Sequence, residues 1–139
     1  MKISTKTRYV ARILIELTLH RDVGPIPVSR IAMAQKIPVK YLEQLLRQLR
    51  QAGFLRSVRG PKGGHILIRD PESITLGEIV RAFETQSELV SCISCPEQCD
   101  MVSSCLVREA WADATRALHR SLDQVRISDL AAQSQALVQ

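Results

Sequence analysis

A glycine-rich basic segment, Arg59-Gly60-Pro61-Lys62-Gly63-Gly64, separates two short runs of strand-forming residues, Phe54–Val58 and His65–Ile68. The glycines permit the positive φ values that a tight hairpin needs, so the sequence predicts a two-stranded β-hairpin, or wing, at this point. A phosphate-binding nucleotide loop is the weaker interpretation, because no Gly-Lys-Ser/Thr sequence opens a helix after these glycines.

Three amphipathic helices are predicted before this hairpin, because apolar residues recur there at three- and four-residue steps. The first two cover Thr5–His20 and Val28–Gln35, and the third runs to about Ala52 from Val39. A glycine and two prolines break the chain after the first helix, and Lys36-Ile37-Pro38 interrupts it after the second. Two helices joined by a tight turn, the second longer and charged on its outer face, are typical of a helix-turn-helix.

The remaining sequence predicts a short helix, a cysteine-rich segment and a long helix. A capping box, Thr75-Leu76-Gly77-Glu78, opens the short helix, which we expect to end near Gln86. An apolar stripe runs from Val107 to Val125, and because such a face needs a partner to bury it, we assign it to a dimer interface. The predicted fold class is therefore mainly α with a small β-hairpin wing: a winged helix-turn-helix plus a long C-terminal dimerisation helix.

The expected organisation has four parts along the chain. Residues 1–86 form the winged helix-turn-helix domain, 87–106 the cysteine-rich loop, 107–126 the dimerisation helix and 127–139 a flexible tail. The tail is expected to be frayed or disordered, because it lies at the terminus and is rich in Gln.

Charge is distributed unevenly along the 139 residues. Residues 1–90 hold 15 Lys and Arg against 8 Asp and Glu, a net +7, whereas residues 91–139 are net −2. A basic region gains affinity for nucleic acid by releasing counterions, although a solvated basic surface without a partner gives the same count. Since no apolar run is long enough to span a bilayer and no export signal is recognisable, we expect a cytoplasmic protein with reduced thiols and no membrane partner.

The outer face of the third predicted helix is suited to reading base edges in the major groove of DNA. For this helix alone a solvated amphipathic face is the alternative, because charged outer faces are common. The basic hairpin favours DNA binding, since an arginine at the tip of such a wing suits insertion into a narrow minor groove. The predicted DNA-binding residues are Lys40, Tyr41, Glu43, Gln44, Arg47, Arg59, Pro61 and Lys62.

All four cysteines, Cys92, Cys95, Cys99 and Cys105, lie within fourteen residues, with the spacing C-x2-C-x3-C-x5-C. Core packing does not explain such clustering and a reducing cytoplasm disfavours disulfides, which leaves a metal or cluster site or redox-active thiols. Structural zinc usually draws on two separated ligand pairs, often including His, and no His lies in this segment. Iron-sulfur clusters take thiolates from one compact loop, and the spacing alone does not choose between the two.

Four segments carry a family resemblance: Tyr41–Arg50, Ser57–His65, Met1–Lys6 and Ile74–Ile79. Together they resemble the bacterial Rrf winged-helix transcriptional regulators, which include the IscR, NsrR, RirA and CymR groups, and the likeness extends to about residue 126. The resemblance implies a homodimer that binds a palindromic operator in double-stranded DNA. It also implies that the third helix enters the major groove and the wing the minor groove.

The resemblance divides the predicted DNA-binding residues by role. Glu43 would accept a hydrogen bond from a cytosine amino group, although an intrahelical ion pair with Arg47 is the alternative. Phosphate contacts set the register on DNA and carry no sequence information. By position, base contacts fall to Glu43 and Gln44, the minor-groove contact to Arg59, and phosphate contacts to Lys40, Tyr41 and Lys62.

The same resemblance implies an iron-sulfur cluster, [2Fe-2S] or [4Fe-4S], in the cysteine segment. Cluster-binding members of the family carry three cysteines in this loop, and the C-x6-C-x5-C spacing of Cys92, Cys99 and Cys105 matches them. Cys95 is additional, and we favour it slightly as the fourth ligand.

Both fourth ligands known in the family are missing here. Where the IscR group has a histidine this chain has Arg108, and where some NsrR proteins use an acid from the partner's first helix it has Thr7-Arg8. Besides Cys95, the alternatives are an oxygen ligand from Glu97 or Asp100, or an open iron site.

The predicted function is a DNA-binding transcriptional regulator, not an enzyme, whose operator binding is controlled by a cluster sensing iron, redox state or nitric oxide. The alternative is a regulator of the same fold without a cluster, which uses thiol redox chemistry, zinc or a partner enzyme. A small thiol enzyme or electron carrier is disfavoured, because no cysteine is paired with a plausible histidine base.

Overall fold

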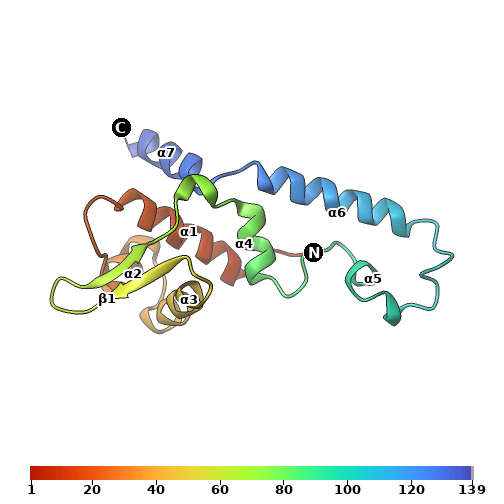
Figure 1. Cartoon of the computed structure of the whole chain (residues 1–139), viewed down its shortest axis with the longest axis horizontal. Helices are drawn as coiled ribbons and strands as arrows, with labels where there is room; N and C mark the ends of the chain where they lie inside the picture. Colours follow the sequence, from red (N-terminus) through yellow and green to blue (C-terminus); the bar gives the residue numbers. More distant parts are fainter. Residues whose placement is uncertain (139) are drawn as a thin grey trace.

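The computed structural model describes residues 1–138 as a helical body from which one long helix extends (Figure 1). The mainly α architecture with one antiparallel hairpin confirms the predicted fold class. The body contains α1 (Thr5–Leu19), α2 (Val28–Gln35), α3 (Val39–Gln51), β1 (Leu55–Val58), β2 (Gly64–Leu67), the short turn η1 (Pro71–Ser73), α4 (Leu76–Phe83) and α7 (Ile127–Val138). The extension contains α5 (Ser91–Ser94), η2 (Pro96–Gln98) and α6 (Arg108–Asp123).

Helix α1 lies at the centre of the body. Ser4 caps it, because its side chain accepts a hydrogen bond from the Thr7 amide at 3.2 Å. Val10, Ile13 and Leu14 are completely buried, and α1 contacts α2, α3, α4, β2 and α7. Each such aliphatic side chain stabilises the fold by about 1.5–3 kcal/mol. The position of α1 therefore fixes the helix-turn-helix relative to the rest of the chain.

The expectation of a flexible tail at residues 127–139 is wrong for its described part. Ile127–Val138 forms helix α7, which packs on α1, and Gln139 lies outside the described residues. Ile127 is completely buried, and its amide donates a hydrogen bond to the Ile74 carbonyl at 2.9 Å. Leu130 and Ala131 lie on the same side of the helix as Ile127, and this apolar face outweighs the polar composition of the segment.

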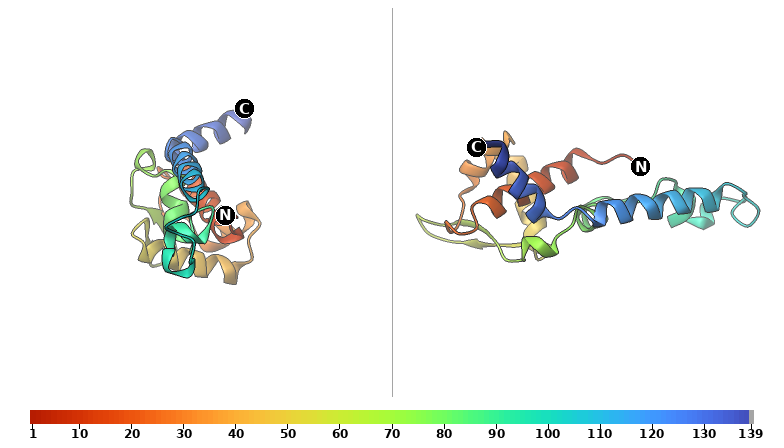
Figure 2. Two further views of the ribbon diagram at one scale, coloured as in Figure 1. Left: turned by 90° about the vertical axis from the view of Figure 1, so that its right-hand side faces the viewer. Right: turned by 90° about the horizontal axis from the view of Figure 1, so that it is seen from above.

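Helix α6 touches its own chain along one narrow face and extends from the body as an arm (Figure 2). Only Ala112 and Thr115 of this helix are buried. The Thr115 hydroxyl accepts a hydrogen bond from the Leu89 amide at 3.3 Å. Near the other end, Arg81 of α4 pairs with Asp123 at 2.7 Å, and its hydrogen bond lowers the pKa of that carboxyl. Within residues 1–138, no helix has both the length and the apolar character needed to cross a lipid bilayer.

Replacing the buried anchor of α7 tests its role in the core. We expect Ile127→Ala to lower the free energy of unfolding by about 2–5 kcal/mol, since it removes methyl groups from a packed site and leaves a cavity. Leu137→Ala in the same helix is the matched control, because Leu137 is 88% exposed. Urea denaturation measures both, and equal, small effects would contradict a packed α7.

Candidate nucleic-acid interface and cysteine segment

The turn between α2 and α3 presents α3 at the surface. Lys36 closes α2 in the left-handed conformation with φ 54°, and Ile37, only 3% exposed, anchors the turn in the core. After Pro38 the chain enters α3, whose apolar face is buried through Leu42, Leu45, Leu46 and Leu49. The opposite face of α3 is therefore directed outward.

The predicted base- and phosphate-contacting residues of α3 lie on this outward face. Tyr41 is half-buried, and its ring packs edge-on against that of Tyr9 with the centroids 5.9 Å apart. Among residues 1–138, the expected alternative ion pair between Glu43 and Arg47 is not formed, which leaves the Glu43 carboxylate available for another partner. The exposed members of the set are Lys40, Glu43, Gln44 and Arg47.

The wing is attached to the body through the strand-like residue Ile26. The Ile26 and His65 amides donate to each other's carbonyl oxygens at 3.0 and 2.9 Å, which extends the hairpin by one bridge. This close approach requires glycine at position 64, because a Cβ there would lie 2.3 Å from the Ile26 oxygen. Gly64 also has a φ of +152°, a conformation that other residues rarely adopt.

The tip of the wing carries the predicted minor-groove residues away from the body. Arg59, Pro61 and Lys62 are all exposed. The tip is closed by a hydrogen bond from the Gly63 amide to the Gly60 carbonyl at 2.9 Å. The wing thus has a basic, exposed tip on a well-paired base.

Three residues outside the predicted site, Arg50, Ser57 and His65, link α3 to the wing. The Arg50 guanidinium donates a hydrogen bond to the Ser57 hydroxyl at 3.0 Å. The same hydroxyl oxygen lies 3.3 Å from Nδ1 of His65. Burial and the nearby Arg50 charge lower the pKa of His65, which favours the neutral ring at pH 7. Helical spacing places Arg50 on the outer face of α3, but its contact with Ser57 has no sequence signal. A shallow cavity of about 250 Å³ lies here, lined by Val28, Glu43, Leu46, Arg47, Arg50 and His65.

The cysteine segment lies at the far end of the arm, away from α3 and the wing (Figure 1). Cys92, Cys95, Cys99 and Cys105 are all free thiols and all half-buried. Within residues 1–138, no three Cys, His, Asp or Glu side chains are arranged to hold one metal ion. The structure therefore gathers the thiols in one segment without assembling them into a ligand set.

Arg108 ties this segment to the start of α6. Its Nη2 donates a hydrogen bond to the Cys92 carbonyl at 3.3 Å. The sequence shows an arginine three residues after Cys105 but gives no signal that its side chain reaches back to Cys92.

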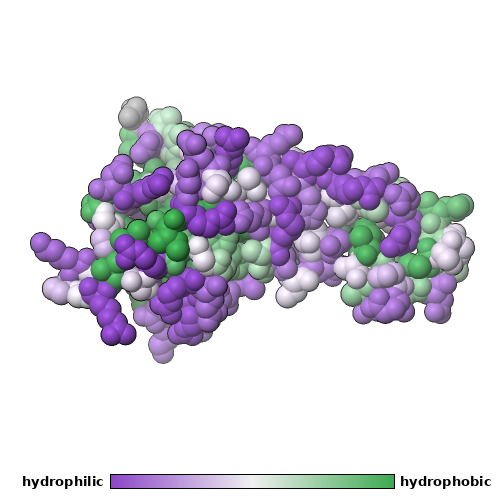
Figure 3. Space-filling model, viewed as in Figure 1, coloured by the Kyte–Doolittle hydropathy of each residue, from purple (hydrophilic) through white to green (hydrophobic). Residues whose placement is uncertain are grey.

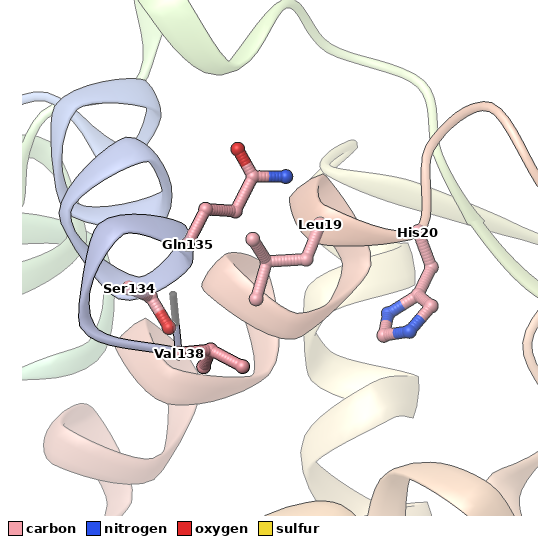
Figure 4. Close-up of a pocket in the computed structure, with 5 residues that line it drawn as sticks. All are labelled: Leu19, His20, Ser134, Gln135 and Val138. Carbon is pink, nitrogen blue, oxygen red and sulfur yellow. The ribbon is translucent and has the colours of Figure 1, made fainter.

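A separate cavity of about 460 Å³ lies between the ends of α1 and α7 (Figure 4). Its lining consists of Leu19, His20, Ser134, Gln135 and Val138. His20 is the single titratable side chain among these five residues, and its Nδ1 lies 3.0 Å from the Glu16 carbonyl.

Known proteins are similar to this chain in both sequence and fold. Residues 3–133 match the Rrf2 family, described as iron-dependent transcriptional regulators. The chain belongs to the Rrf2 family. The protein rrf2 of Nitratidesulfovibrio vulgaris is 37% identical over 130 residues, which cover 94% of this chain and 87% of that protein.

Two solved structures of regulators have the same fold. The match to T. potens IscR has 30% identity and a TM-score of 0.77, and covers 96% of this chain and 88% of that one. The match to CymR, the global cysteine regulator of B. subtilis, has 36% identity and a TM-score of 0.78, and covers 96% and 98%. The predicted family is thus confirmed, and the chain is a DNA-binding transcriptional regulator of the Rrf2 family and not an enzyme.

Alanine substitutions at Gly60 and Gly64 of the wing distinguish the energetic cost of backbone strain from that of a steric clash. We expect Gly64→Ala to lower the free energy of unfolding by about 3 kcal/mol or more, because backbone strain and a clash with Ile26 add. Gly60→Ala should cost about 1–2 kcal/mol from strain alone, since a Cβ at position 60 would meet no other atom within 4 Å. Thermal unfolding followed by circular dichroism compares them, and equal losses would argue against packing of the wing on Ile26.

Proposed function

We propose that this Rrf2 regulator binds a palindromic operator as a homodimer and that an iron-sulfur cluster in the cysteine segment controls this binding. The observation that carries the proposal is the gathering of four free, half-buried cysteines at the start of the α6 arm. The description of the family as iron-dependent supports an iron-containing group. The proposal requires a cytoplasmic location, where these thiols stay reduced.

We propose α3 as the element that reads bases in the major groove. Glu43 and Gln44 project from its exposed face, and each well-formed base contact contributes about 1–3 kcal/mol of discrimination. Because Glu43 has no cationic partner within residues 1–138, its carboxylate can accept a hydrogen bond from a cytosine amino group. Arg47, one turn further along α3, extends the same surface with a guanidinium suited to guanine or phosphate.

The wing and the start of α3 supply the electrostatic part of the interface. Arg59 would enter the minor groove, where its charge meets an enhanced negative potential, with Pro61 beside it at the tip. Lys40, Tyr41 and Lys62 would contact phosphates and set the register of the protein on DNA.

The exposed apolar face of α6 supports a homodimer. Trp111 is 46% exposed and Val107 55%, and hydrophobic surface is visible at the end of the arm where α6 begins (Figure 3). A mainly apolar cavity of about 370 Å³ lies beside α1, α4 and α7, with Ile3, Ala11 and Val80 in its lining. The α6 helix of a second copy would bury its apolar face against α6 and this cavity. In a two-fold symmetric dimer each subunit makes the same contact with the other, so the apolar faces of both copies would be buried.

The donor set of the cysteine segment fits an iron-sulfur cluster. Cys92, Cys99 and Cys105 would hold it, with Cys95 as the favoured fourth ligand. Thiolates are the usual cluster ligands, and the buried Nε of Arg108, which has no hydrogen-bond partner within residues 1–138, suits an anionic neighbour. A bound cluster would make the protein sensitive to redox state, nitric oxide or the availability of iron. Thiols that merely pack in the fold would not provide this sensitivity.

The link from this segment to DNA would run through α6. Arg108, the first residue of α6, is hydrogen-bonded to Cys92 of the segment. The pair between Arg81 and Asp123 connects the other end of α6 to α4. Any rotation of the arm in a dimer would change the separation of the two α3 helices, and operator affinity depends on that half-site spacing.

A regulator without a cluster is the second candidate, and two observations favour it. The thiols are not assembled into a metal-binding set within residues 1–138, and the similar B. subtilis CymR is named as a cysteine regulator. In this case the thiols would respond by oxidation, by binding zinc or through a partner protein.

Removing one wing charge tests the proposed phosphate contact. For Lys62→Ala we expect weaker binding to all DNA sequences alike and a shallower plot of log affinity against log salt, by about 0.9 for the one phosphate that this lysine would neutralise. Arg116→Ala on α6 makes the same charge change away from the proposed interface and should leave the slope unchanged. Fluorescence anisotropy with operator and random DNA at several salt concentrations makes the comparison; an unchanged slope for Lys62→Ala would exclude the contact.

Metal analysis tests the cluster. Anaerobically purified protein should be brown, with stoichiometric iron and acid-labile sulfide, and Cys99→Ala should lose the colour and the iron because a thiolate ligand is gone. Ser103→Ala in the same loop keeps all four thiols and should remain brown. Colourless protein, even after reconstitution with iron and sulfide, would contradict the cluster and favour the second candidate, and bound zinc would then identify its metal-binding form.

A further inference from the structure

Arg108 joins the two ends of the cysteine segment. Its backbone amide donates to the Cys105 carbonyl at 3.4 Å, and its side-chain Nη2 donates to the Cys92 carbonyl at 3.3 Å. The guanidinium is thereby held at Cys92, the first of the four cysteines, while the backbone of the same residue is bonded to Cys105, the last.

One N–H donor of this guanidinium, Nε, has no hydrogen-bond acceptor among residues 1–138. Nε of Arg108 is buried from solvent and has no hydrogen-bond partner, the one such side-chain atom found among residues 1–138. Buried donors in native proteins are nearly always satisfied, so an unpaired one points to an acceptor that completes the site.

The positive charge of Arg108 also lacks a local counter-charge. No carboxylate within residues 1–138 forms an ion pair with it, although the neighbouring Glu109 pairs with Arg116 at 2.9 Å. An anion bound in the segment would supply both a hydrogen-bond acceptor for Nε and a partner for the charge.

We infer that Arg108 is a positioning residue for the proposed cluster: its Nε–H donates a hydrogen bond to an anionic sulfur of the cluster, and its charge offsets that of the thiolates. This inference rests on the proposed function. Arg108 is not a ligand, because a guanidinium stays protonated in proteins and has no lone pair to offer.

The expected effect is on cluster retention and reduction potential. Hydrogen bonds to cluster sulfur and nearby positive charge favour the reduced, more negative state and thus raise the reduction potential. Partners of this outer kind also hold the metal, and their loss typically weakens metal binding by about 10- to 100-fold.

The test compares Arg108→Gln and Arg108→Lys with wild-type protein, each reconstituted anaerobically as the full chain. Gln removes the charge but keeps an amide N–H at the position of Nε, whereas Lys keeps the charge and has no donor at that position. Potentials are measured by spectroelectrochemical titration, and iron loss by transfer to a ferrous chelator. We expect both variants to have lower potentials than wild type, Gln because the positive charge is lost and Lys because the Nε donor is lost. Both should lose iron about tenfold faster or more.

Arg120→Gln is the matched control, because Arg120 is exposed on the same helix. It should change neither quantity. A purely structural role for the bond to the Cys92 carbonyl would reduce the loading yield but leave the potential of loaded protein unchanged. If Arg108→Gln does not load, the Lys variant decides, and a wild-type potential in it overturns the hydrogen bond from Nε.

The outcomes separate this inference from the function on which it rests. Wild-type protein that takes up no cluster contradicts the proposed function, and the role of Arg108 is overturned with it. Loaded wild-type protein with indistinguishable potentials and iron-loss rates in the Arg108 variants overturns the role of Arg108 alone.

Discussion

Burial of α1 is the interaction on which the other elements depend. Val10, Ile13 and Leu14 are inaccessible to solvent, and the helix contacts the helix-turn-helix, the wing, α4 and α7. Because packed interiors tolerate little displacement, these contacts hold α3 and the wing as one rigid unit. A rigid unit is what reading DNA requires, since a recognition helix and a minor-groove wing must keep a fixed separation to occupy neighbouring grooves.

Local signals made most of this fold predictable. The helices before the hairpin follow from apolar spacing, and the hairpin follows from glycines whose conformations the structure bears out at Gly60 and Gly64. Helix α7 was missed because its polar composition suggested fraying, while its stability comes from contacts of Ile127 with Ile74 and α1. The apolar face was readable in the sequence, but the surface that buries it was not, because it lies far away along the chain.

The candidate site divides in the same way. Exposure of Lys40, Glu43 and Gln44 on α3 follows from helical periodicity, which fixes the outward face once the leucine face is buried. The clustering of four cysteines within fourteen residues is visible in the sequence alone. The contacts that tie the parts together, from Arg50 to Ser57 and from Arg108 to Cys92, join residues on different elements, and no local pattern encodes them.

The arrangement of α6 explains how a change at the cysteines could reach the DNA without direct contact. The 16 residues of this helix span about 24 Å at the usual rise, with the cysteine segment at one end and the body at the other (Figure 1). Its own chain buries only Ala112 and Thr115 of this helix. In the proposed homodimer, the packing of α6 would therefore depend on the partner subunit as much as on the body. A helix held mainly by an interface can shift as a rigid rod when one end is reordered. In the proposed homodimer, reordering of the cysteine segment would therefore alter the geometry of the whole dimer, while the core around α1 would keep each proposed DNA-binding unit intact.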